Sequence, residues 1–399
     1  MPSLKTSQIP ALTGFRAIAA ALVFFYHWFF SYVTELPLPI RAPFEIGYVG
    51  VPMFFALSGF LITARYCDDF ARRRITFGAY LAKRFTRIYP LYFAVLTLLV
   101  IALQRPEGMI PKDLRGYAAT YTLTQALFPS LLLIGTTVGW TLTIEEMFYF
   151  IAPGLMRWLD QPSWWAGVLP RALALSAVAL AAGWGLSSLN GGPLLQDTLV
   201  GAPATYLLHY SLFGHLPDFL AGMVSGLIYL RRDTLPNLTR WASPLIWLSV
   251  AGAYACMVAT VLTNGPLGSP LNRTLTFGVA LFSSSALLGM ACDSRQRNLV
   301  TRALSWKPIV YLGTTSYALY LIQLTQPCQW LYWSFFGDTL GIADRIARAV
   351  LSYAGTAVLA AGLYELIEHP AQQWLNTHLV RRIEQPPRLE RAPQVTGGR

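Results

Sequence analysis

Two polar side chains interrupt an apolar stretch near the start of the chain. Residues 12–30 are apolar enough to cross a bilayer, yet they include Arg16 and His27. On an α-helix the spacing of these two residues amounts to about three turns and about 16 Å of rise, so both side chains share one face. Ionisable groups inside a membrane tend to be functional, and an uncharged imidazole can serve as a general base. The alternative is structural, with Arg16 reaching the membrane surface and His27 bonded to a neighbouring helix.

A pair of arginines precedes the third apolar segment. Arg84 and Arg87 are three residues apart, so a helix projects both to one side. Guanidinium groups bind phosphate oxygens through two parallel hydrogen bonds. The pair therefore predicts an anion site, whereas the preceding run at 72–74 is assigned to membrane orientation.

A fourth apolar segment opens with two adjacent carboxylates. Glu145 and Glu146 differ by about 100° around a helix, so only one of them can face the interior of a bundle. Glu145 shares its face with Tyr149, which makes Glu145 the candidate for chemistry. The alternative is that both acids complement the dipole at the helix start. A further acid, Asp218, is expected to pair structurally with a nearby histidine, and the five histidines lack the spacing of metal ligands, so no metal is expected.

The elements that must position these residues are membrane helices. Hydrophobic residues make up 54% of the 399 and charged residues only 12%, about half the charged fraction of soluble domains. The apolar segments are continuous rather than alternating, which excludes a barrel. The fold class is therefore an all-α polytopic membrane protein. The net charge of +11 lies mostly in short loops, a distribution that favours membrane lipids and other anionic groups over nucleic acid.

The hydropathy pattern predicts about ten transmembrane helices with both termini cytoplasmic, because Lys and Arg concentrate in the segments on one side. A less hydrophobic segment rich in Thr and Tyr, 117–136, is interpreted as re-entrant or interfacial. Residues 1–375 are expected to form one membrane-embedded domain, and the polar, Pro-rich residues 376–399 a disordered cytoplasmic tail. The expected spans are 12–34, 46–64, 88–104, 138–157, 172–189, 211–230, 242–262, 273–292, 308–330 and 347–367.

Several stretches, in order, resemble acyltransferase family 3, the bacterial membrane-bound sugar O-acyltransferases. The similarity covers about residues 8–375 and rests on the combination of motifs rather than on any one of them. The matching stretches are Leu12-Thr13-Gly14-Phe15-Arg16 with the spacing to His27, Gly50 to Ile62, Arg84-x-x-Arg87-Ile88-Tyr89-Pro90, Trp140-Thr141-Leu142 through Glu145 to Phe148-Tyr149, Asp218 to Met223, Tyr311 to Ile322, and Ile367-Glu368-His369-Pro370.

This resemblance implies transfer of an acyl group, most often acetyl, from cytoplasmic acyl-CoA to a hydroxyl of a glycan, glycolipid or lipid-linked sugar. It implies a multi-pass protein of the bacterial cytoplasmic (inner) membrane, with lipopolysaccharide among the acceptors. The implied roles are CoA phosphate binding by Arg16, Arg84 and Arg87, general base or acyl carrier for His27, and orientation of that histidine or binding of the acceptor by Glu145. Ser58, Trp140 and Tyr149 are the candidates for oxyanion or acceptor contacts.

One position departs from the family pattern. Many relatives have a histidine directly after the Tyr-Leu-Ile element, where this chain has Gln323. An amide keeps the hydrogen bonding but does not exchange protons near neutral pH. The rival interpretation of all these residues is a transporter or flippase of a glycan or lipid, in which they form a proton or substrate path.

Overall fold

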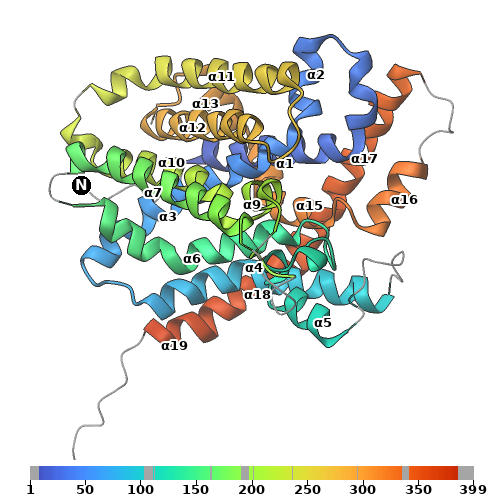
Figure 1. The fold of residues 1–399 in the computed structure, drawn as a ribbon, viewed down its shortest axis with the longest axis horizontal. Helices are drawn as coiled ribbons and strands as arrows, with labels where there is room; N and C mark the ends of the chain where they lie inside the picture. The colour runs from blue at the N-terminus through green and yellow to red at the C-terminus, as the bar shows by residue number, and fades with distance from the viewer. Residues whose placement is uncertain are drawn as a thin grey trace, which may run out of the picture.

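A computed structural model describes residues 9–102, 111, 113–161, 164–189, 197–200, 202–235, 237–293, 295–334 and 341–384. Helices account for the regular structure of these residues (Figure 1). The main helices are α1 (Pro10–Phe29), α2 (Leu38–Glu45), α3 (Gly50–Ala71), α4 (Phe77–Ala102), α5 (Leu114–Tyr121), α6 (Gly139–Leu159), α7 (Trp164–Ser187), α9 (Ala204–Tyr210), α10 (Leu212–Leu230), α11 (Leu238–Thr263), α12 (Pro270–Cys292), α13 (Leu299–Leu304), α14 (Lys307–Thr314), α15 (Ser316–Ile322), α16 (Gln326–Ser334), α17 (Ile342–Leu363), α18 (His369–Leu375) and α19 (Arg381–Glu384).

Shorter turns connect several of these helices. Two of them are π-helical and lie between α17 and α19, so that a nearly continuous helical segment runs from residue 342 to residue 384. The connecting turns are η2 (Phe30–Glu35), η3 (Gly47–Val49), η4 (Gln125–Leu127), η5 (Pro129–Leu131), η6 (Arg232–Thr234), η7 (Tyr364–Glu368) and η8 (Asn376–Val380).

The protein is a multi-pass membrane protein. Within the described ranges, seven helical segments are long and apolar enough to span a bilayer. The expected interfacial segment 117–136 contains only the short helix α5 and two single turns, which confirms that it is not a full span. The seven segments are Pro10–Phe29, Gly47–Ala71, Gly167–Ser187, Ala204–Leu230, Leu238–Thr263, Pro270–Cys292 and Ile342–Val380.

The expected count of ten is not confirmed, because three of the expected spans are not among these seven. The expected span 308–330 is instead broken into α14, α15 and α16. The other two fall on α4 and α6, which have 26 and 21 residues and each include three charged side chains. These charged side chains include Arg84, Arg87 and Glu145, which are candidate site residues.

The helix α1 lies in the interior of the bundle and packs against α3, α14, α15 and α17 (Figure 1). Its approach to α14 depends on Gly313, because a Cβ there would lie 1.9 Å from the carbonyl oxygen of Thr13. A similar contact joins α3 to α10, where a Cβ on Gly222 would lie 1.9 Å from the carbonyl oxygen of Ala56. These close approaches fix α1 and α3, the two helices that contribute Arg16 and Ser58.

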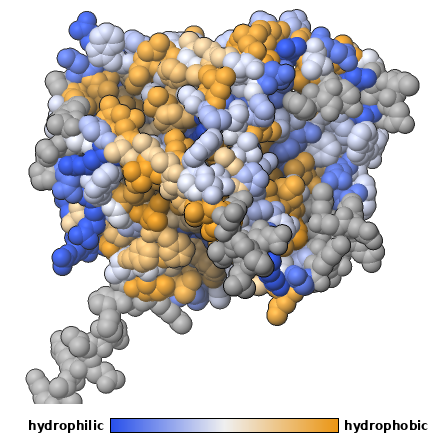
Figure 2. Space-filling view, viewed as in Figure 1, coloured by the Kyte–Doolittle hydropathy of each residue, from blue (hydrophilic) through white to orange (hydrophobic). Residues whose placement is uncertain are grey.

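Apolar side chains cover much of the visible face in Figure 2. The helices α7 and α11 expose large residues such as Trp184 and Trp247, as expected of lipid-facing helices. The expected disordered tail differs from the structure at its start, because residues 376–384 are helical. Val380 is buried and Asn376 accepts a hydrogen bond of 3.0 Å from Thr86 of α4, so packing against α4 orders this piece. The remaining tail, 385–399, lies outside the described residues.

Candidate functional site

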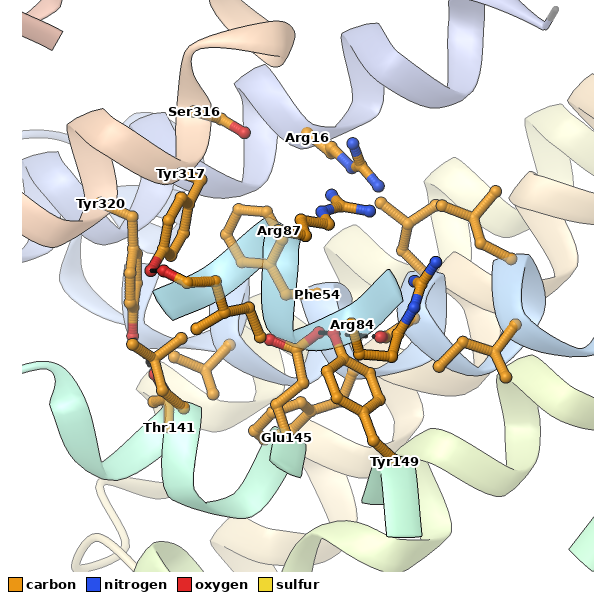
Figure 3. A pocket seen from close by; sticks show the side chains of 18 residues that line it. Arg16, Phe54, Arg84, Arg87, Thr141, Glu145, Tyr149, Ser316, Tyr317 and Tyr320 are labelled. Carbon is orange, nitrogen blue, oxygen red and sulfur yellow. Dashed lines mark hydrogen bonds between the residues drawn. The ribbon is translucent and has the colours of Figure 1, made fainter. Parts of the chain in front are cut away.

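A cavity of about 100 Å³ in the bundle is bordered by α1, α3, α4, α6 and α15. Three arginines line it, Arg16 from α1 and Arg84 and Arg87 from α4 (Figure 3). Figure 3 shows their guanidinium groups gathered along one side, with Tyr317 and Tyr320 along the other. The predicted convergence of these three arginines is therefore present in the structure.

The three guanidinium groups differ in how they are held. Arg84 is 9% exposed and donates a 2.8 Å hydrogen bond to the hydroxyl of Tyr66, while its buried Nε has no partner. Over the part of the chain that the structure describes, Arg16 and Arg87 form neither a hydrogen bond nor an ion pair. Arg16 lies close enough to Arg84 and Arg87 to be repelled by both. Arg16 and Arg87 are half-buried, and like charges held together in such a place are costly unless an anion joins them.

Glu145 lies on the floor of the same cavity and receives two hydrogen bonds on one carboxylate oxygen. Ser58 Oγ donates at 2.9 Å and the Tyr149 hydroxyl donates at 2.6 Å, both to Oε1 (Figure 3). Both hydroxyl protons are thus engaged by the carboxylate, so neither is free to donate to an oxyanion in this arrangement. Glu145 also lies close enough to Arg16 to attract it electrostatically. The negative charge sits among the arginines, and no contact joins it to His27 among the described residues.

A second cavity, of about 310 Å³, adjoins the first. The two share Arg16, Leu61, Arg84 and Arg87, so the arginines form the border between them. The second cavity is bordered by the beginning of α1 and by the segment from α17 to α18, which contributes Glu368. It is therefore the cavity farther from His27 along α1.

His27 lies about three turns beyond Arg16 on α1, and its side chain is exposed. Its imidazole lies against the amide of Gln323 and packs edge-on against Tyr26, with ring centroids 5.3 Å apart. Gln323 is fully buried and donates from Nε2 to the carbonyl of Tyr320 at 3.1 Å. Its Oε1 is buried and accepts no hydrogen bond of normal geometry from the described residues. That oxygen is thus available to an imidazole N–H.

Aromatic rings surround this end of α1. Tyr26 packs against Tyr48, Tyr48 against His209, and His209 against Trp140, with ring centroids 5.3 to 5.9 Å apart. Trp140 also packs edge-on against Tyr210 at 5.0 Å. The indole N–H of Trp140 has no hydrogen-bond partner in the described ranges. Trp140 therefore belongs to this aromatic cluster and not to the arginine-lined cavity.

The expected partner of Asp218 is confirmed. His215 Nδ1 lies 2.7 Å from Asp218 Oδ2, and Arg273 Nη2 lies 2.6 Å from the same oxygen. Asp218 is fully buried, and Arg273 also donates two hydrogen bonds to the carbonyl of Gly214. The triad joins α10 to α12, which supports the structural role expected for this acid.

Comparisons with known proteins agree with this architecture. A family model described as an acyltransferase domain matches residues 9–365. The chain belongs to this acyltransferase family. The match runs from α1 into η7 and includes the first cavity, His27 and the aromatic cluster, whereas Glu368 and Gln372 of the second cavity lie beyond it. No solved structure matches the chain.

The named relatives of this chain include peptidoglycan O-acetyltransferases and an exopolysaccharide production protein. The chain is 25% identical to the peptidoglycan O-acetyltransferase OatA of Listeria monocytogenes, over 92% of this chain and 56% of the relative. It is 24% identical to the putative peptidoglycan O-acetyltransferase YrhL of Bacillus subtilis, over 91% of this chain and 54% of the relative. It is 28% identical to the exopolysaccharide production protein ExoZ of Rhizobium meliloti, over 70% of this chain and 76% of the relative. The chain thus spans about half the length of the first two.

Six of the eight predicted site residues line the first cavity, and two do not. Arg16, Ser58, Arg84, Arg87, Glu145 and Tyr149 border it, whereas His27 and Trp140 lie at the aromatic end. Two further residues escaped the sequence reasoning as site members. Gln323 is predicted only as a departure from the family pattern, and Glu368 only as part of a stretch that matches the family. The signal in the sequence that could have identified Gln323 is its position, where many relatives of the family have a histidine.

Proposed function

We propose that this acyltransferase moves an acetyl group from cytoplasmic acetyl-CoA to a hydroxyl of a glycan, glycolipid or lipid-linked sugar at the bacterial inner membrane. The observation that carries the proposal is the cavity between Arg16, Arg84 and Arg87, two of which have no ion pair or hydrogen bond in the described structure. Acetyl as the acyl group is supported by similarity to relatives such as the peptidoglycan O-acetyltransferase OatA.

The arginine group suits the phosphates of CoA. An anion that accepts hydrogen bonds from Arg16 and Arg87 removes the repulsion among the guanidinium groups and gains charge-assisted hydrogen bonds in a place with little water. Glu145 balances part of the positive charge, and its two hydroxyl partners keep its position fixed. No metal is needed for this role, and among the described residues no His, Cys, Asp and Glu cluster has metal-ligand geometry.

The reaction requires the donor to extend along α1. If its phosphates contact Arg16, the thioester must lie about 16 Å further along the helix to reach His27. The long pantetheine arm of CoA supplies such a reach. The phosphate end and the reacting end of one donor would then occupy the arginine-lined cavity and the aromatic end.

At His27 the chemistry is direct transfer with general-base catalysis. An unprotonated imidazole nitrogen accepts the proton of the acceptor hydroxyl while that oxygen bonds to the thioester carbon. The tetrahedral intermediate then collapses, the carbon–sulfur bond breaks, and the thiolate of CoA receives the proton from the imidazolium. Gln323 Oε1 lies beside the ring and is available to the other ring nitrogen, and a hydrogen bond there would fix the tautomer and the ring orientation. Direct transfer is preferred to an acyl-His intermediate because it needs only a correctly placed neutral imidazole.

The oxyanion of that intermediate needs a hydrogen-bond donor. Ser58 and Tyr149 already donate to Glu145, which leaves Trp140 as the candidate with a free N–H. The same indole and its neighbouring rings offer apolar faces to the C–H groups of a sugar ring. We therefore assign the acceptor to the aromatic cluster, in which Tyr48 and His209 link Trp140 to Tyr26 beside His27.

The proposal is tested with purified protein, ¹⁴C-labelled acetyl-CoA and a panel of free and lipid-linked glycans. Label is expected to move to at least one glycan and to be released again by mild alkali, as an O-acetyl ester is. Transfer that requires no acceptor hydroxyl, or movement of a glycan across a liposome membrane without acetyl-CoA, contradicts the proposal. The second result supports a transporter instead.

A further inference from the structure

Glu368 is a buried acid with no partner among the described residues. It is 7% exposed, and its Oε2 is enclosed without a hydrogen bond. It lies on the wall of the second cavity, close enough to Arg16 and Arg87 for electrostatic attraction, yet it forms an ion pair with neither. A buried carboxylate costs free energy unless hydrogen bonds or opposite charges compensate it. A ligand between Glu368 and the arginines would therefore have to compensate the carboxylate as well as the guanidinium groups.

The backbone around Glu368 is unusual as well. The residue ends the π-helical turn η7, which interrupts the long helical segment from α17 to α18. Such turns are rare and are frequent at functional sites. Glu365, which belongs to the same turn, is exposed and accepts a 3.2 Å hydrogen bond from the hydroxyl of Tyr311. The turn thus presents one acid outward and the other to the cavity.

The ligand must carry both an anion and an N–H donor. Phosphates would contact the arginines on the border of the two cavities, and an N–H group would donate to Glu368. Tyr66 and Tyr364 also line this cavity and offer aromatic surface. In acetyl-CoA, phosphates lie between an aminopurine at one end and the pantetheine arm at the other. With the arm extended toward His27, the purine falls on the side of the arginines that faces Glu368.

We propose that Glu368 is a donor-specificity residue that accepts a hydrogen bond from the exocyclic amine of the adenine of acyl-CoA, with the ring held in the second cavity. This inference rests on the proposed function, because it needs CoA as the donor. It assigns the two cavities different parts of one molecule. The first receives the start of the pantetheine arm, and the second receives the base.

Equilibrium binding of CoA and of 1,N⁶-etheno-CoA, in which the amine is closed into a ring and no longer donates, tests the proposal. The wild type is expected to bind CoA about tenfold more tightly than etheno-CoA, as expected for a lost hydrogen bond to a charged group. Glu368→Gln is expected to bind CoA about fivefold more weakly than the wild type and to prefer CoA over etheno-CoA by less than the wild type does, because an uncharged amide oxygen accepts a weaker hydrogen bond. Glu365→Gln is the matched control and is expected to keep the wild-type affinities.

The direction of the change in CoA affinity distinguishes a Glu368 that binds adenine from a Glu368 that only repels phosphate. If Glu368 only repels the phosphates, Glu368→Gln binds CoA more tightly, and this result overturns the inference. Equal binding of CoA and etheno-CoA by the wild type overturns it too, without any variant, so the test survives a Glu368→Gln protein that does not fold. No CoA binding by the wild type overturns the proposed function itself and the inference with it.

Discussion

The two ends of α1 provide opposite environments for a ligand. Around Arg16 the lining includes several charged residues, with three arginines and Glu145 at one cavity and Glu368 at the next. Around His27 the neighbours are uncharged, namely aromatic rings and the amide of Gln323. A charged lining suits an anionic donor that arrives from the cytoplasm, and an aromatic one suits a neutral sugar. Under the proposed function, the two substrates would approach one face of α1 from opposite ends.

The largest expected effect concerns the aromatic end. We predict that His27→Ala lowers kcat for acetyl transfer by about 10²- to 10⁴-fold, because the general base is removed. The affinity for CoA, measured by equilibrium binding, is expected to stay within about twofold, because the arginines are untouched. A variant with the thermal stability and the transfer rate of the wild type would refute the role of His27.

At the arginine-lined end of α1, removal of a charge is expected to weaken donor binding. We predict that Arg87→Ala raises the KM for acetyl-CoA by about tenfold to hundredfold, the range for hydrogen bonds to charged groups, and leaves the KM for the acceptor unchanged. The exposed Arg74 of the loop before α4 provides the control, and Arg74→Ala is expected to behave as the wild type. If both variants change KM equally, general positive charge and not a built site attracts the donor.

A smaller effect is expected at Gln323. Gln323→Leu keeps the volume but removes the oxygen that orients His27, and kcat is expected to fall by up to about tenfold while both KM values hold. Gln323→Asn, which keeps an amide, serves as the comparison in the same steady-state assay. A fall in donor affinity without a fall in kcat would place Gln323 at the donor site instead.

The smallest effect is expected at the acceptor. Trp140→Phe keeps an aromatic face and loses the N–H, and the KM for the acceptor is expected to rise by about threefold with the donor KM unchanged. Trp184→Phe, on the exposed face of α7, is the matched control. A larger rise in the donor KM would move Trp140 out of the acceptor site.

Local spacing was sufficient for part of this site. The i,i+3 spacing of Arg84 and Arg87 and the i,i+4 spacing of Glu145 and Tyr149 correctly placed each pair on one helix face, and both pairs line one cavity. The helical class followed from continuous apolar segments. Spacing within one helix, however, says nothing about how helices rotate against each other.

The parts that escaped prediction depend on such tertiary contacts. The contact of Gln323 with His27 joins residues from α1 and the end of α15, and Glu368 lies near Arg16 and Arg87 because the turn η7 packs against α4. The expected span 308–330 failed because hydropathy averages over a segment and does not register the breaks after α14 and α15. Glu145 was expected to orient His27 or bind the acceptor, and its hydrogen bonds to Ser58 and Tyr149 place it among the arginines.

The central claim is that one donor molecule extends along α1 from Arg16 to His27, and its most direct test is a cryo-EM map of the protein with bound CoA. We predict density with phosphates against Arg16, Arg84 and Arg87 and a pantetheine arm that ends beside His27 and Gln323. Density whose phosphates lie away from these arginines, or whose arm ends away from His27, would contradict the account.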